Sequence, residues 1–143
     1  MTAWTQSYNY RNALVAMANW TPEGFIGSML QAHTPIVPPP SGVPSSLAWG
    51  QEETVRERFG GRVGGLTCTR RILELRFPFP PAAVTELFAT CYGPTIATLR
   101  ATDMNGASRL RADLTRLFTQ HNIAGDGMTV VAGEYRDVQA RVA

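Results

Sequence analysis

The sequence predicts an α+β fold, in which a small mixed or antiparallel sheet of about three strands packs with four to five helices. Two observations carry this prediction. Three segments, at 13–20, 66–77 and 128–142, are apolar or alternate with the period of a β-strand. The segments between them place apolar residues at helical spacing, and Gly and Pro residues separate the two kinds of segment. We expect one domain over 1–143, because this length suits a single hydrophobic core.

The first strand and helix are predicted near the N-terminus. Residues 1–11 are polar and aromatic without a clear period, and indicate a loose arm. Ala13–Trp20 is apolar on both faces, which is typical of a strand covered on two sides. Thr21 and Pro22 then have the character of an N-cap and a first helical position, so a helix over 22–32 is predicted.

A proline-rich loop and a second helix follow. Residues 35–46 contain five prolines and one glycine, which excludes regular helix and predicts an extended, semi-rigid surface loop. A helix is expected over 51–59, and Gly60 should end it. The alternating segment 66–77 then predicts a strand with one face more buried than the other.

Three helices are expected before the last strand. The first begins at Pro81, a shorter piece covers 95–101, and the third covers 107–121. Their predicted inward residues are Val84, Leu87, Phe88 and Cys91 in the first helix, and Leu110, Leu114, Leu117 and Phe118 in the third. The closing strand at 128–142 could be broken at Gly133.

Composition excludes several classes of protein. Hydrophobic residues make up 44% of the chain and charged residues 17%, and the net charge of +2 is too small to indicate a nucleic-acid or membrane-surface partner. No run approaches the roughly 20 apolar residues that span a bilayer. Cys68 and Cys91 have neither disulfide nor metal spacing, and are expected to be small buried residues of a cytoplasmic protein. No metal site is expected.

Four residues are candidates for substrate binding. Asn19 and Trp20 end the first strand, and ligands of open α/β sheets bind at the carboxyl ends of strands. Trp20 could instead pack under the proline loop. Trp49 and loop 38–46 could cover an apolar pocket, or the tryptophan could simply pin the loop. Tyr92 could orient a substrate, although a buried tyrosine bonded to backbone is more common. No catalytic residue is assigned.

Two other features indicate structure rather than chemistry. The glycine-rich stretch 60–65 follows a predicted helix and precedes a predicted strand, the reverse of a nucleotide-binding turn, so we interpret it as a helix stop and strand entry. His33 and His121, the two histidines, lie at helix ends without a partner that suggests a metal site or a triad.

Four short stretches resemble the C-terminal half of class I S-adenosylmethionine-dependent methyltransferases acting on small molecules. They are "ANWTPEGFIG" (18–27), "PPPSGVPSSLAWG" (38–50), "YGPT" (92–95) and "VVAGEY" (130–135). The resemblance, which covers 12–143, implies that the last strand returns between the other two. It also implies that the cofactor-binding first half is absent, so no cofactor is expected on this chain alone.

The resemblance leaves two functions open. The chain could be a methyltransferase-related protein that retains the substrate-side half and is inactive alone. It could also be a non-catalytic α+β module that binds a small apolar ligand or a protein partner. In either case the Ala13–Trp20 strand would lack its parallel neighbour, so we expect a homo-oligomer, most simply a dimer, or a partner chain at this edge.

Overall fold

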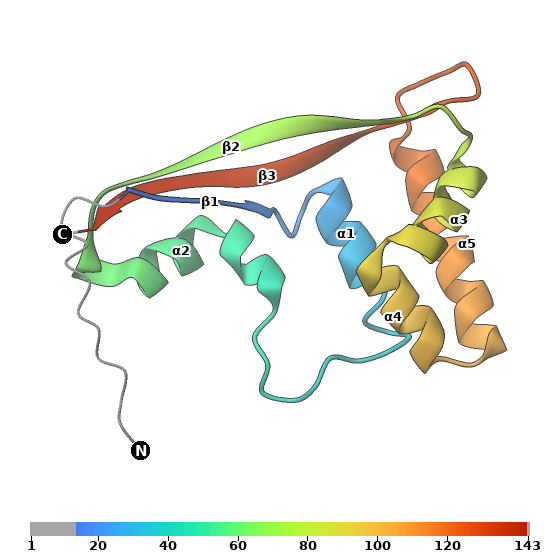
Figure 1. Cartoon of the computed structure of the whole chain (residues 1–143), viewed down its shortest axis with the longest axis horizontal. Coiled ribbons are helices and arrows are strands. Elements are labelled where there is room, and N and C mark those ends of the chain that lie inside the picture. The colour runs from blue at the N-terminus through green and yellow to red at the C-terminus, as the bar shows by residue number, and fades with distance from the viewer. Residues whose placement is uncertain (1–13, 143) are drawn as a thin grey trace.

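The computed structural model describes residues 14–142, which form a sheet of three strands and five α-helices (Figure 1). The predicted arm at 1–11, and Ala13 at the start of the first strand, lie outside the described residues. The elements, in chain order, are β1 (Leu14–Trp20), α1 (Phe25–Gln31), the 3-10 turn η1 (Ser46–Gly50), α2 (Glu52–Phe59), the 3-10 turn η2 (Gly60–Arg62), β2 (Val63–Phe77), α3 (Pro81–Cys91), α4 (Gly93–Ala101), α5 (Met104–His121) and β3 (Thr129–Val142). The predicted fold class is confirmed.

The three strands form one antiparallel sheet in the order β1-β3-β2. β3 lies in the middle and pairs antiparallel with both neighbours, so that Met17 and Cys68 lie on either side of Val138. β1 and β2 therefore run parallel to each other without touching. The last strand returns between the first two, as expected.

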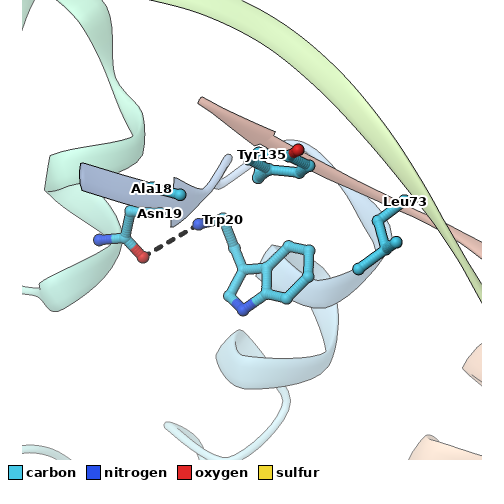
Figure 2. Close-up of a pocket in the computed structure, with 5 residues that line it drawn as sticks. All are labelled: Ala18, Asn19, Trp20, Leu73 and Tyr135. Carbon is cyan, nitrogen blue, oxygen red and sulfur yellow. Dashed lines mark hydrogen bonds between the residues drawn. The ribbon is translucent and has the colours of Figure 1, made fainter. Parts of the chain in front are cut away.

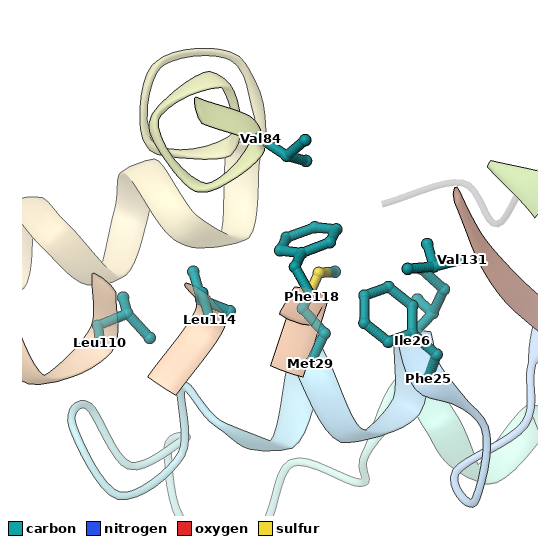
Figure 3. Packing of buried hydrophobic residues seen from close by; sticks show 8 residues of the cluster. All are labelled: Phe25, Ile26, Met29, Val84, Leu110, Leu114, Phe118 and Val131. Carbon is teal, nitrogen blue, oxygen red and sulfur yellow. The ribbon is translucent and has the colours of Figure 1, made fainter. Parts of the chain in front are cut away.

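The main hydrophobic core lies at one end of the sheet, between the β3 strand and the helices α1, α3 and α5 (Figures 1 and 3). Its buried members are Phe25, Ile26, Met29, Val84, Leu110, Leu114, Phe118 and Val131. Phe118 is fully buried, and its ring lies 5.1 Å from those of both Phe25 and Phe88. Edge-to-face and tilted contacts of this kind add stability to the area that they bury.

A second apolar layer covers the opposite end of the sheet. α2 and η1 pack beneath β1 and β2 there (Figure 1). Val55 of α2 and Leu47 of η1 are buried, as are Val138 and Ala140 of β3. Since side chains alternate along a strand, each end of the sheet has one covered face and one open face.

The prediction that β1 is covered on two sides is wrong for the described part of the chain. Leu14, Ala16 and Ala18 are exposed, whereas the alternate residues Val15 and Met17 are half-buried. The run is apolar on both faces, but η1 and α2 cover only one of them.

The predicted start of the first helix is also wrong. α1 begins at Phe25 with Gly24 as its N-cap, three residues later than expected. Thr21 does not cap the helix, because its hydroxyl group donates a 2.7 Å hydrogen bond to the carboxylate of Glu134 on β3. Gly27 explains the tight turn: a Cβ there would lie 2.3 Å from the carbonyl oxygens of Thr21 and Pro22.

The remaining differences concern helix faces and one strand. α5 begins at Met104, earlier than predicted, because the Asp103 carboxylate caps it by accepting from the Gly106 N–H. In α3, Leu87 and Cys91 are exposed rather than inward, and Cys68 on β2 is only half-buried. β3 continues through Gly133 without a break.

His33 joins α1 to α4. Its buried imidazole lies with Nδ1 2.9 Å from the Met29 carbonyl oxygen and Nε2 3.0 Å from the Thr95 hydroxyl group. The carbonyl can only accept, so Nδ1 carries the proton and the neutral ring accepts from Thr95 at Nε2. Burial lowers the pKa of His33 below its ordinary value, because it disfavours the charged form.

This joint predicts a pH dependence of stability. The folded-state pKa of His33 lies below 6.5, so the unfolded chain binds more protons between the two values and the free energy of unfolding falls as the pH drops below about 6.5. Urea denaturation between about pH 7.5 and pH 5.5 measures this slope. We expect His33→Gln to flatten it. An equal slope in wild type and His33→Gln would contradict the assignment.

Candidate functional site

The end of β1 forms a corner from which most of the candidate site is built. Asn19 uses both ends of its side-chain amide there: Oδ1 accepts from the Trp20 N–H at 2.9 Å (Figure 2), and Nδ2 donates to the Ser46 carbonyl at 2.7 Å. Gly50 approaches so closely that a Cβ would lie 2.1 Å from the Trp20 carbonyl oxygen. The corner therefore contacts both ends of η1, at Ser46 and at Gly50.

A pocket of about 370 Å³ lies on the open face of the sheet beside this corner. Ala18, Asn19 and Trp20 line it from β1, Leu73 from β2 and Tyr135 from β3 (Figure 2). The rings of Trp20 and Tyr135 meet edge to face, with centroids 6.0 Å apart. We call these five residues the Trp20 pocket.

Pairing across the sheet sets the shape of the Trp20 pocket. Trp20 is opposite Tyr135 on β3, and Leu73 on β2 is opposite Gly133. The Trp20 ring lies over Gly133, where a Cβ would come within 2.9 Å of Cζ3. Glycine is therefore required in the middle of β3 for the indole to lie against the sheet, which explains why the residue does not mark a break.

Three polar side chains line the Trp20 pocket beside the apolar Ala18 and Leu73: the Asn19 amide, whose two ends are already hydrogen-bonded, the Trp20 indole and the Tyr135 phenol. The indole N–H of Trp20 donates hydrogen bonds, and the hydroxyl group of Tyr135 both donates and accepts. Its lining side chains carry no formal charge, and the charged neighbours two residues along β2 and β3 on the same face, Arg71 and Asp137, form an ion pair of 2.8 Å with each other. Small-molecule sites commonly combine an apolar lining with a few polar groups in this way.

The other two candidates lie elsewhere. Trp49, on η1, packs edge to face against Phe59 at 6.1 Å and lies 4.4 Å beneath the Arg58 guanidinium. It is therefore held against α2 rather than over a pocket. Tyr92, between α3 and α4, packs 5.0 Å from the Phe88 ring at the margin of the core, where burial raises the pKa of its hydroxyl group. The described residues bring together Asn19 and Trp20, but neither Trp49 nor Tyr92 joins them.

A charged network lies on the opposite face of the same corner. The Glu134 carboxylate accepts from Thr21 and, at 2.6 Å, from Arg70, and these hydrogen bonds lower its pKa. Arg136 donates to the Gly50 carbonyl at 2.9 Å and to the Glu52 carboxylate at 3.0 Å. Because these groups satisfy one another, the network fixes η1 and α2 to the sheet. Among residues 14–142, no three His, Cys, Asp or Glu side chains are placed to hold a metal ion.

A separate cavity of about 450 Å³ lies between the proline loop, Leu47 of η1, the end of α1 and the start of α4; from the loop it is lined by Pro39, Val43, Pro44, Ser45 and Ser46. The expectation that this loop covers an apolar pocket therefore has a structural counterpart, although Trp49 is not among its described lining residues. Reasoning from the sequence missed Leu73 and Tyr135 as pocket residues. The sequence predicted that the last strand lies between the other two, but not the residue register that places Leu73 and Tyr135 beside Trp20.

Comparisons with known proteins identify relatives of this chain, but they do not assign it to a protein family. No protein-family model matches the sequence. The uncharacterized protein Mb1438c of Mycobacterium bovis is 32% identical over 135 residues, which cover 92% of this chain and 47% of the relative. The uncharacterized protein Rv1405c of Mycobacterium tuberculosis is 34% identical over 110 residues, or 75% of this chain and 40% of the relative. The chain thus spans about half the length of the curated relatives it matches. None of the helices in residues 14–142 is long and apolar enough to cross a membrane.

The corner generates a stability prediction. Asn19→Ala would leave the Trp20 N–H and the Ser46 carbonyl without their partner, so we expect the free energy of unfolding to fall by about 1–2 kcal/mol. Asn105→Ala, on the exposed side of α5, removes the same amide where it has no such role, and should change stability by less than about 0.5 kcal/mol. Chemical denaturation measures both variants, and equal effects would show that the Asn19 amide does not hold the corner.

Proposed function

We propose that this chain supplies the substrate-side portion of an S-adenosylmethionine-dependent methyltransferase that acts on small molecules, and that it is inactive alone. The strand order carries the proposal. A final strand that returns antiparallel between two parallel neighbours is the arrangement that the resemblance implies, and β1-β3-β2 has this order. The cytoplasmic location expected from the sequence is part of the same proposal.

The described residues do not fit the cofactor itself. The glycine-rich stretch at 60–65 ends α2 and leads into β2, so no helix N-terminus follows it. The turn from β1 to α1 contains Gly24, but a Cβ placed on Gly24 would lie only 2.9 Å from the Thr21 hydroxyl oxygen and 3.1 Å from the Cβ of Glu134, so the space beside it is filled. In this proposal the chain therefore contributes no cofactor contact. It contributes surfaces that hold the methyl acceptor, because such enzymes act largely by positioning.

The Trp20 pocket is the proposed acceptor surface. It lies at the carboxyl end of β1, where ligands of open α/β sheets bind, and Asn19 positions Trp20 by accepting its backbone N–H. The longer relatives leave room for a cofactor-binding part, since this chain spans about half of their length.

Titration of S-adenosylmethionine tests the proposal. We expect saturable heat when it is added to the full-length relative Mb1438c, and none when it is added to the 143-residue chain. ATP serves as the control ligand, because it shares the adenosine moiety but carries no methyl sulfonium. A full-length relative that binds no S-adenosylmethionine would contradict the proposed lineage, and tight binding by this chain alone would contradict the division of labour.

The alternative, a non-catalytic module that binds a small apolar ligand or a protein partner, is supported by a different observation. The charged pairs around the corner, Arg70 with Glu134, Arg136 with Glu52 and Arg71 with Asp137, are hydrogen-bonded, so none of these side chains is a free acid or base beside the Trp20 pocket. In this alternative the pocket binds its ligand without chemistry.

We further propose that the outer edge of β1 joins a second copy of the chain. Among the described residues β1 has one neighbour, and its sequence LVAMANW contains neither charge nor proline to discourage pairing. The other edge strand differs, because β2 carries Arg70, Arg71, Glu74 and Arg76. Leu14 at the start of β1 is 68% exposed. Two identical edges can pair antiparallel about a two-fold axis.

Light scattering after size exclusion tests this edge. We expect the mass of a dimer for the wild type and of a monomer for Ala16→Lys, which places a charge on an exposed position of β1. Ser108→Lys adds the same charge on the exposed side of α5 and should remain dimeric. A monomeric wild type at high concentration would rule out the dimer.

A further inference from the structure

The cavity under the proline loop differs from the Trp20 pocket in its walls. Leu30 and Leu47 form part of its apolar wall, one from the end of α1 and the other from η1, and Leu47 is buried. Pro39, Pro44 and Pro94 add three pyrrolidine rings to the lining. The volume of about 450 Å³ falls within the roughly 300–1,000 Å³ of small-molecule sites.

The lining of this cavity carries no ionisable side chain. The chain has thirteen basic and eleven acidic residues, yet none of them is among the described residues around the cavity. A charged ligand would lose part of its hydration against these walls without gaining an ion partner, which is unfavourable. The cavity therefore favours an uncharged ligand.

A few polar groups in the cavity wall could orient a bound ligand. Thr34 and Ser46 contribute hydroxyl groups for which no hydrogen bond is found among residues 14–142, so both can donate to or accept from a ligand. The Gln31 amide is already oriented, because its nitrogen donates to the Pro22 carbonyl at 3.0 Å. Its carbonyl oxygen remains an acceptor at the cavity wall. A ligand with a hydroxyl or carbonyl group would match these partners.

The proline rings favour an aromatic ligand. Proline-rich segments bind aromatic surfaces because the flat ring packs on an aromatic face and the fixed φ leaves little entropy to lose. Here the roles are reversed, with the prolines on the protein. The end of the loop is also attached to the β1 corner through the hydrogen bond from Asn19 to Ser46, which holds this part of the wall in place before a ligand arrives (Figure 1 shows the loop between α1 and α2).

We propose that the cavity under the proline loop is a binding site for an uncharged aromatic molecule that carries a hydroxyl or carbonyl group. This site goes beyond the proposed function, since binding takes place on this chain whether or not methyl transfer follows. It is also separate from the Trp20 pocket, which lies on the open face of the sheet.

Calorimetric titration of the 143-residue chain with 2-naphthol tests the proposal, without S-adenosylmethionine. We expect saturable binding of 2-naphthol, and at least tenfold weaker binding of 2-naphthoate, which has the same rings and a negative charge. Absence of 2-naphthol binding at millimolar concentration would overturn the site. Equal binding of the two probes would overturn the argument from the uncharged lining. Because no cofactor is present, failure here is distinct from failure of the methyltransferase proposal.

Three substitutions to tryptophan locate the site. Thr34→Trp fills the cavity from an exposed position, and should weaken 2-naphthol binding at least tenfold. Ala18→Trp fills the Trp20 pocket instead, and should change the affinity less than twofold. Met104→Trp, at a residue that is 86% exposed, is the matched control for an added indole and should also have little effect. Loss of binding in Ala18→Trp with full binding in Thr34→Trp would overturn the assignment. Circular dichroism confirms that each variant is folded.

Discussion

The pairing of β3 with both other strands is the constraint on which the rest of this structure depends. β1 and β2 run parallel and do not touch, so only β3 joins them into a sheet. The same strand contributes Val131 to the main core and Val138 and Ala140 to the layer under α2. Both apolar layers, and the corner between them, therefore depend on the register of one strand that is added last along the chain.

The corner at the end of β1 shows how this constraint reaches the candidate site. Trp20 can lie flat on the sheet because its neighbour in β3 is Gly133, and Tyr135 meets it because the two residues are opposite each other. On the other face, Glu134 and Arg136 hold the turn after β1 and the turn before α2. One short stretch of β3 thus fixes an apolar pocket on one face and a satisfied ionic network on the other.

Local sequence patterns predicted most of the helices and strands, because capping, helical spacing and strand alternation depend on residues only a few positions apart. The helices from Pro81 and near residue 107, the stop at Gly60 and the strand at Ala13–Trp20 all depend on such rules. The features that were predicted wrongly depend on contacts with residues far away in the sequence. Thr21 resembles an N-cap until Glu134, more than a hundred residues later, accepts its hydroxyl. The apolar character of Leu14 and Ala18 indicated a second cover that no described element supplies.

The residues of the candidate site also differ in whether local sequence patterns could predict them. Asn19 and Trp20 could be predicted because the end of a strand is recognisable in the sequence, whereas Leu73 and Tyr135 required the register. The sequence suggested that Trp49 covers an apolar pocket together with the proline loop and that Tyr92 orients a substrate. Each instead found an aromatic neighbour close in sequence: Phe59 for the first and Phe88 for the second.

The sheet order requires that β3 pairs with both β1 and β2, which do not contact each other. Backbone nuclear Overhauser contacts in the isotope-labelled chain test this most directly. The structure requires contacts from Val138 to both Met17 and Cys68. Contacts from Val138 to only one of these residues, or direct contacts between β1 and β2, would contradict the sheet order and the lineage inferred from it.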